Sequence, residues 1–299
     1  MTIDYIDLNF LGSDRVIATA VLQGADGVTL IDPGPTSCLP ALEAGLRDRG
    51  FTLRDVRNVL LTHIHLDHAG AAGTIAERVP GVRVYVHERG APHMIDPSKL
   101  LASATRLYGD RMDLLWGAFQ AVPESQVTVL KGGEQLDMAG RSWRVAYTPG
   151  HAKHHVSYLD EQHGVAYVGD TAGVQVSGEF LIAPTPPPDI DIEAWLASLD
   201  TIDAWQPVSL FLTHFGPITP AGAHLARFRT TLSVAAAASK ELLAQGGTDE
   251  EMAHRFAERM RVDVRKSLPE HEARASELAA PFDQLFLGLQ RYWSKKAGH

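Results

Sequence analysis

The sequence predicts a mixed α/β fold, of the α+β kind, with a helical appendage at its C-terminal end. The chain has 299 residues, and its first two-thirds alternates short apolar segments with glycine- and proline-rich turns, a pattern typical of strands. Several of these segments are followed directly by histidine or aspartate, and no strand pattern remains after Pro220. We therefore expect a main domain over residues 1–220, with a helical insertion at about 97–121, and a helical subdomain over residues 221–299.

Composition and charge exclude several classes of protein. Apolar residues make up 45% of the chain and charged residues 21%, which are ordinary globular values. The net charge of −9 argues against binding to a nucleic-acid backbone. No apolar stretch approaches the ~20 residues of a membrane span, and the first ten residues lack the basic segment of a signal peptide. The single cysteine, Cys38, cannot form an internal disulfide, which fits a reducing compartment, so we expect a cytoplasmic protein. We expect it to act on a small molecule, not on nucleic acid or a membrane.

The first elements follow from turn and cap signals. Residues 16–23 and 28–31 predict two strands, and the turn Gly24-Ala25-Asp26-Gly27 between them predicts a hairpin. Residues 41–49 predict a helix that ends at Gly50. The next expected elements are a strand over 59–61, a helix over 69–79 and a strand over 82–86.

The segment 97–121 interrupts this alternation. Leu100, Leu107, Met112 and Trp116 recur with helical spacing, which predicts one or two helices inserted between strands. Such helices can overhang a site at the strand ends, and their larger side chains can also be plain core. The candidate pocket walls are Tyr108, Met112, Trp116 and Phe119.

Strands resume after the insertion, and helices follow to the end. The proline-rich segment 184–188 predicts an extended arm. Thr248 and Glu251 form the capping box of a helix, and the apolar face from Leu278 to Trp293 needs a cover. That cover is either the chain's own core or a second copy in a homodimer. The other expected elements are strands over 127–130, 143–147, 156–159, 165–168 and 208–212 and helices over 192–205 and 221–245.

A dense group of possible metal ligands follows the strand at 59–61. The segment reads Thr-His-Ile-His-Leu-Asp-His-Ala-Gly over residues 62–70. His63 and His65 are two residues apart and point to one side of an extended backbone, and Asp67 and His68 follow where a helix begins. Imidazole and carboxylate together suit zinc, and also iron or manganese.

Three further strand ends deliver the same chemistry. His151 follows a Pro-Gly turn, Asp170 follows Val168-Gly169, and His214 follows the strand at 208–212. In layered α/β folds, binding sites collect at the ends of strands. We therefore expect these residues to meet the histidine-rich segment in space.

The four motifs THIHLDHAG, TPGHAKHH, GDT and LTHFG, in this order, resemble those of the metallo-β-lactamase-fold hydrolase superfamily. The resemblance implies an αββα sandwich with a dinuclear metal site at one edge. It implies that His63, His65 and His151 hold one ion, that Asp67, His68 and His214 hold the other, and that Asp170 bridges the two. Asp32 matches an early acid that steadies the ligand loop, although a turn aspartate before Pro33 explains it equally well.

The chain departs from the family pattern in two places. His154 stands where the family usually has glycine, and we expect it to be exposed to solvent; His155 matches a histidine outside the ligand set. The C-terminal helical region does not match the substrate-binding signature of glyoxalase II, and the chain lacks the added domain of the nucleases of this fold.

The resemblance implies a metal-dependent hydrolase with two divalent ions, zinc first and iron or manganese as alternatives. A hydroxide that bridges the metals would attack an ester, thioester or lactone carbonyl, and Asp67 would orient this nucleophile as well as bind metal. Two alternatives stay open: an iron-dependent redox enzyme, such as a persulfide dioxygenase, and a non-hydrolytic binding or regulatory protein. A β-lactamase proper is disfavoured, because those enzymes are exported.

Overall fold

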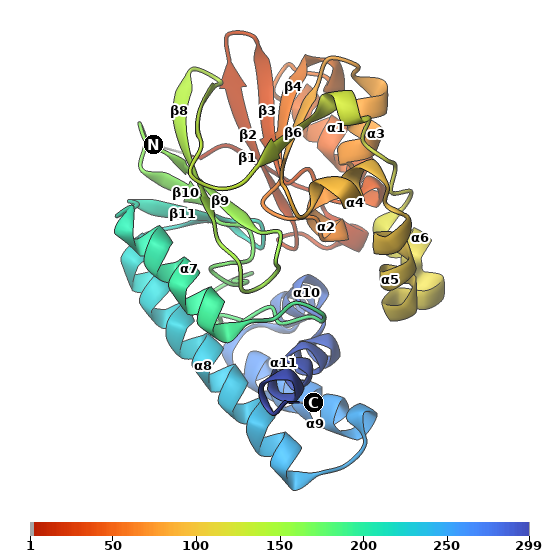
Figure 1. The fold of residues 1–299 in the computed structure, drawn as a ribbon, viewed down its shortest axis with the longest axis vertical. Coiled ribbons are helices and arrows are strands. Elements are labelled where there is room, and N and C mark those ends of the chain that lie inside the picture. The colour runs from red at the N-terminus through yellow and green to blue at the C-terminus, as the bar shows by residue number, and fades with distance from the viewer. Residues whose placement is uncertain (1–2, 299) are drawn as a thin grey trace.

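The computed structural model describes residues 3–298 and contains two six-stranded sheets packed face to face (Figure 1). The first sheet has the order β1-β2-β3-β4-β5-β6, antiparallel through β3 and parallel from β3 to β6. The β2–β3 hairpin confirms the predicted turn at 24–27. The bounds are β1 (Tyr5–Asp7), β2 (Ala18–Gly24), β3 (Gly27–Ile31), β4 (Val56–Leu60), β5 (Arg83–His87) and β6 (Val127–Leu130).

The second sheet has the order β12-β11-β10-β9-β8-β7, with one parallel pair, β10 and β11. Its strands are β7 (Gln135–Met138), β8 (Arg141–Tyr147), β9 (Val156–Asp160), β10 (Val165–Tyr167), β11 (Ser209–Leu212) and β12 (Gly216–Ile218). Three of the twelve strands of the described residues, β1, β7 and β12, were not predicted from the sequence. These edge strands have only three or four residues each, too few for alternation to register.

Helices cover the outer face of each sheet, so the layers run αββα as the resemblance implies (Figure 1). The predicted helix over 69–79 is two short helices, and the insertion also holds two. The helices beside the first sheet are α1 (Leu39–Arg47), α2 (Leu66–Ala69), α3 (Ala72–Arg78), α4 (Ala91–Ile95), α5 (Ser98–Tyr108) and α6 (Met112–Trp116).

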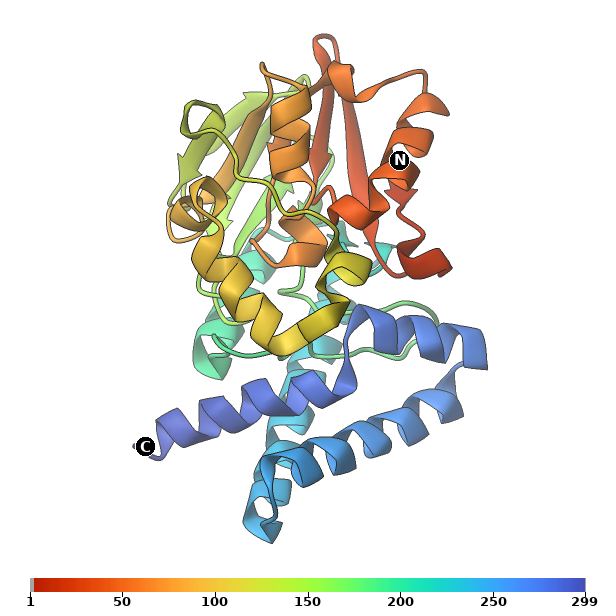
Figure 2. The same ribbon diagram turned by 90° about the vertical axis from the view of Figure 1, so that its right-hand side faces the viewer.

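The remaining helices cover the second sheet and then cross one end of the sandwich, where they appear in blue below the yellow α5 and α6 (Figure 2). They are α7 (Ile192–Ala204), α8 (Ala221–Gln245), α9 (Asp249–Ser267), α10 (Glu270–Ala279) and α11 (Phe282–Lys296). The capping box of Thr248 and Glu251 opens α9 as predicted. Within residues 3–298, no helix is both long and apolar enough to cross a membrane.

The apolar face of α11 packs inside the chain. Phe286 and Leu289 are buried, Phe286 contacts Phe256 of α9, and the Trp293 indole donates to the Ala236 carbonyl of α8. The chain's own core therefore covers this face, which was one of the two alternatives expected from the sequence. The homodimer and the boundary between residues 220 and 221 stay predictions.

The core between the sheets holds the site in place. Trp143, Tyr158, Tyr167 and Phe211 are fully buried between the two sheets. The Tyr158 hydroxyl crosses the interface and donates to the carbonyl of Leu61 at 2.8 Å. The second sheet is thereby fastened to the backbone directly before the histidine-rich segment.

Candidate metal centre

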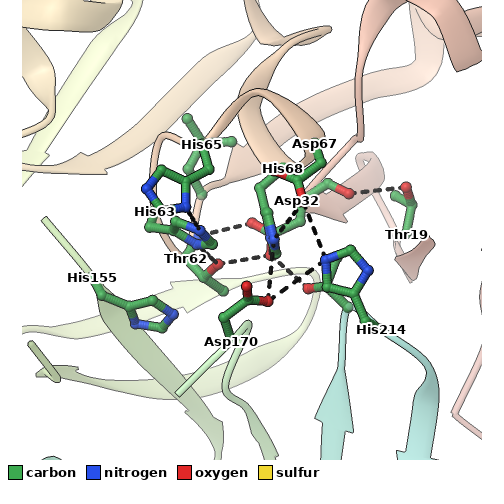
Figure 3. A network of polar contacts seen from close by, with 12 residues as sticks. Thr19, Asp32, Thr62, His63, His65, Asp67, His68, His155, Asp170 and His214 are labelled. Carbon is green, nitrogen blue, oxygen red and sulfur yellow. Dashed lines mark hydrogen bonds and ion pairs between the residues drawn. The ribbon is translucent and has the colours of Figure 1, made fainter. Parts of the chain in front are cut away.

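Seven side chains, all of them expected from the sequence, converge at one edge of the two sheets. His63 and His65 lie in the loop after β4, and Asp67 and His68 lie on α2 (Figure 3). His151 comes from the loop between β8 and β9, Asp170 follows β10, and His214 follows β11. One of these segments follows a strand of the first sheet and three follow strands of the second, so packing of the two sheets brings four distant segments together.

The first group is His63, His65 and His151. Their ligand atoms lie within 4.8 Å of one another. The Nε2 atoms of His63 and His151 each lie 3.0 Å from Nδ1 of His65. Three ring nitrogens that face a common point offer one face of a tetrahedral site.

The second group is Asp67, His68 and His214. Oδ2 of Asp67 lies 3.3 Å from Nε2 of His214 and 3.7 Å from Nε2 of His68. These atoms also lie within 4.8 Å of one another. The grouping agrees with the second ligand set that the resemblance implies.

Asp170 lies between the two groups and turns one oxygen toward each. Its Oδ2 is 3.5 Å from Nε2 of His151. Its Oδ1 is 3.2 Å from Nε2 of His68 and 3.7 Å from Nε2 of His214. This is the placement that a bridging carboxylate needs.

The donor atoms fit a pair of divalent ions. His63, His68, His151 and His214 are each at most 2% exposed, and Asp170 is 4% exposed. Nε2 of His68, Nε2 of His214 and Oδ1 of Asp170 are buried without a well-aligned hydrogen bond. Unpartnered buried polar atoms are costly, and here they point at one another from several sides. Nitrogen and carboxylate donors in this arrangement suit zinc, iron or manganese.

Backbone carbonyls select the tautomers of two ligands. Nδ1 of His151 donates to the carbonyl of Pro184 at 2.7 Å, and Nδ1 of His214 donates to the carbonyl of Val16 at 2.6 Å. A carbonyl only accepts, so the neutral rings carry their proton on Nδ1. Nε2 of each ring is left with a lone pair for a metal ion.

Asp32 holds the histidine-rich segment in place through hydrogen bonds. It is fully buried, and its Oδ1 accepts the backbone N–H of Thr62 at 2.8 Å. Its Oδ2 accepts from the hydroxyls of Thr62 and Thr213, both at 2.7 Å, and faces Nδ1 of His68 at 2.8 Å. These contacts favour the steadying role over that of a simple turn residue.

Charge differs between the two groups. Burial lowers the pKa of His63 well below its usual value and that of His65 to about 4, and neighbouring imidazoles add to both effects. Burial also disfavours charge on His68, but the carboxylates of Asp170 and Asp67 outweigh it and raise its pKa. The first group is therefore neutral imidazole, while the second carries carboxylates that stabilise positive charge.

His154 corrects one expectation. Its ring is half-buried, not exposed to solvent: it stacks parallel to His63 at 6.1 Å, and its Nδ1 lies 3.4 Å from the backbone nitrogen of Ile64. Because the loop between β8 and β9 turns back over His63, this position faces the site. His155 is fully buried against the hydroxyls of Thr148 and Thr171, outside the ligand groups.

A cavity of about 270 Å³ adjoins the metal centre. Of the four candidate walls in the insertion, Tyr108 and Trp116 line it, whereas Met112 and Phe119 do not. The proline-rich arm and the α10–α11 junction also line the cavity, and neither was expected there from the sequence. The run of prolines at 184–188 was the available signal for the arm; nothing local marked the junction.

The fold is an αββα sandwich with overlapping His/Asp clusters at one edge that could hold metal ions. Residues 13–214 match the family model of the metallo-beta-lactamase superfamily. The chain belongs to this superfamily.

Curated relatives and solved structures are consistent with membership of this superfamily. A metallo-beta-lactamase fold-containing protein of Sulfurisphaera tokodaii is 30% identical over 208 residues, which cover 68% of this chain and 75% of that protein. A hydroxyacylglutathione hydrolase of a Synechococcus strain is 29% identical over 50% of this chain and 47% of its own length. The crystal structure of a metallo-beta-lactamase family protein from Thermus thermophilus has a TM-score of 0.66 and 26% identity, and covers 94% of this chain and 89% of that one.

Proposed function

We propose that the chain is a hydrolase with two divalent ions, zinc in the first place, that cleaves an ester, thioester or lactone bond. The observation that supports this most directly is the overlap of the ligand groups: Asp170 turns one oxygen to each of them. Similarity to proteins named hydroxyacylglutathione hydrolase and probable metallo-hydrolase supports the reaction class.

A pair of bound divalent ions lowers the pKa of a shared water toward ~7 and so supplies hydroxide at neutral pH. The chain's own residues prepare for this chemistry. Oδ2 of Asp67 faces His214 and His68, which leaves its Oδ1 to accept a hydrogen bond from the attacking water and orient it. Asp67 also lines the cavity, where a substrate would lie.

The charge of the site suits a polarised carbonyl. Asp67 and Asp170 are the two ligand carboxylates, and His68 and His214 hold the pKa of Asp170 well below its usual value although its burial acts in the other direction. Two carboxylates and a hydroxide do not fully neutralise two divalent cations. The site therefore attracts the electron-rich oxygen of the bond to be cleaved.

Metal analysis and a substrate panel test the proposal together. Freshly purified protein should contain close to two zinc ions per chain, and it should hydrolyse at least one of a thioester, a lactone and an aryl ester. His214→Ala should lose metal and activity, whereas His271→Ala, at an exposed histidine of α10, should keep both. Folded, zinc-loaded protein with no turnover on any class would refute the proposal, and bound iron with oxygen uptake would replace it with the redox alternative.

A further inference from the structure

One face of α5 forms a wall of the cavity and is mainly apolar, with Lys99 and Ser103 as its polar members. Leu100, Ala104 and Leu107 follow one another at helical spacing, and all three line the cavity. Ala104 is buried, while Leu100 and Leu107 stay half-buried because they face the cavity. Ala102, on another face of the same helix, is exposed and does not line it.

The opposite wall is apolar and held firmly. Prolines of the arm and the residues Leu278, Ala279 and Ala280 form it. The Thr185 hydroxyl donates to the Leu285 carbonyl at 2.9 Å, which ties the arm to α11. Gly288 of α11 lies so close to the arm that any side chain there would clash with the carbonyl of Thr185. This wall is therefore already in place before a ligand binds.

The polar lining of the cavity includes the candidate ligands and His154, and also His93, Ser103 and Gln284. The phenol of Tyr108 donates to Gln284 at 3.4 Å and packs edge-on against Trp116. Burial and the carboxylate of Asp67 both raise the pKa of this phenol. Two charged residues also line the cavity: Lys99, which is exposed, and Asp189, which pairs with Lys153 at 3.2 Å. A ligand with a carbonyl group at the candidate metal centre and a hydrocarbon chain along the apolar residues of α5, the arm and the α10–α11 junction matches these surfaces.

We propose that the substrate carries an unbranched apolar acyl chain of medium length, which lies between α5 and the arm while its carbonyl reaches the metal centre. This inference rests on the proposed hydrolase function and names its substrate class. The cavity of about 270 Å³ is slightly smaller than the ~300–1,000 Å³ of sites for drug-sized molecules, so it accepts a medium chain and not a long one.

Chain length sets the size of the expected effect. Each methylene that leaves water for an apolar wall contributes about a fourfold gain, which corresponds to ~0.8 kcal/mol. In a series of thioesters of one small thiol, kcat/KM should rise about fourfold per methylene from acetyl to hexanoyl. The rise should stop before dodecanoyl, where the cavity is full.

Two substitutions on α5 and one control locate the chain. Ala104→Phe fills the cavity and should move the optimum to shorter acyl groups, because it lowers kcat/KM for the hexanoyl thioester more than for the acetyl thioester. Leu107→Ala removes part of the wall and should reduce the gain per methylene without loss of fold. Ala102→Phe adds the same ring to the exposed face and should behave as the unsubstituted protein.

Calorimetric binding of straight-chain carboxylates to the zinc-loaded protein gives a readout that needs no turnover. The Kd should fall with chain length in the same order, and Ala104→Phe should weaken the longer carboxylates only. A protein that binds this series but cleaves nothing would refute the hydrolase function and keep the apolar site. A Kd and kcat/KM that do not depend on chain length, or tighter binding of a hydroxylated chain of equal size, would overturn the inference.

Discussion

Asp32→Asn should weaken metal binding by the second ligand group more than by the first, because Asp32 contacts His68 directly and His63 only through Thr62. Asn keeps one carbonyl oxygen and tolerates the left-handed backbone of this position, where φ is 51°, so the turn survives. It replaces Oδ2 by an amide donor, which then faces the hydroxyls of Thr62 and Thr213 and Nδ1 of His68. The hydroxyls can rotate and accept, but the His68 ring must move its proton to Nε2, the atom that belongs to the second ligand group.

The magnitude follows from these contacts. Substitution of a residue that orients a ligand typically lowers metal affinity about 10–100-fold, or roughly 1.4–2.7 kcal/mol. Loss of hydrogen bonds to an ionised carboxylate should also reduce the free energy of unfolding of the metal-free protein by about 2–4 kcal/mol.

Competition with a chromophoric zinc chelator measures the affinity of each of the two proposed sites separately. We expect the affinity of one ion to fall within this range and that of the ion that His63, His65 and His151 would hold to fall by a smaller factor. Asp26→Asn, on the exposed β2–β3 turn, is the matched control. If folded Asp32→Asn bound both ions as tightly as the control, Asp32 would not set the His68 tautomer.

Three further predictions concern a turn, a thiol and a histidine. Gly150 has a φ of 139° and lies against the backbone of Trp195. Gly150→Ala should therefore lower the free energy of unfolding by more than ~2 kcal/mol, as denaturant titration would show. It should also lower the affinity for the ion that His151 would hold, as zinc competition would show. Burial raises the pKa of Cys38 to about 11, so a thiol reagent at pH 8 should label it only as fast as the protein unfolds. Burial also lowers the pKa of His87 below 6.5, so the unfolded chain takes up a proton at this residue before the folded chain does as the pH falls. The free energy of unfolding should therefore decrease as the pH is lowered from 6.5, and this decrease should be less steep in His87→Phe.

Each of these predictions has a contrary outcome that is easy to see. Unchanged stability in Gly150→Ala would mean that the turn before His151 can move away from α7. Rapid labelling of native Cys38 would mean that the thiol is reached without unfolding. Identical pH profiles for the unsubstituted protein and His87→Phe would show that burial of His87 does not disfavour its charged form.

Local patterns predicted much of the fold. The hairpin at 24–27, the capping box at Thr248 and the helical spacing of the insertion depend on residues close in sequence, and all three appear in the structure. The one helix expected over 69–79 is broken at residues 70 and 71, between α2 and α3. Nothing in its apolar pattern marked this break.

The residue types and order of His63 to His214 sufficed to predict a metal centre, because few other arrangements place so many imidazoles and carboxylates directly after strands. Tertiary packing decided the rest. Whether His154 faces solvent or the site depends on how its loop returns over His63, and the cavity walls come from segments separated by more than 150 residues. Spacing along a chain carries no information about such contacts, since packing between layers, and not local propensity, brings these segments together.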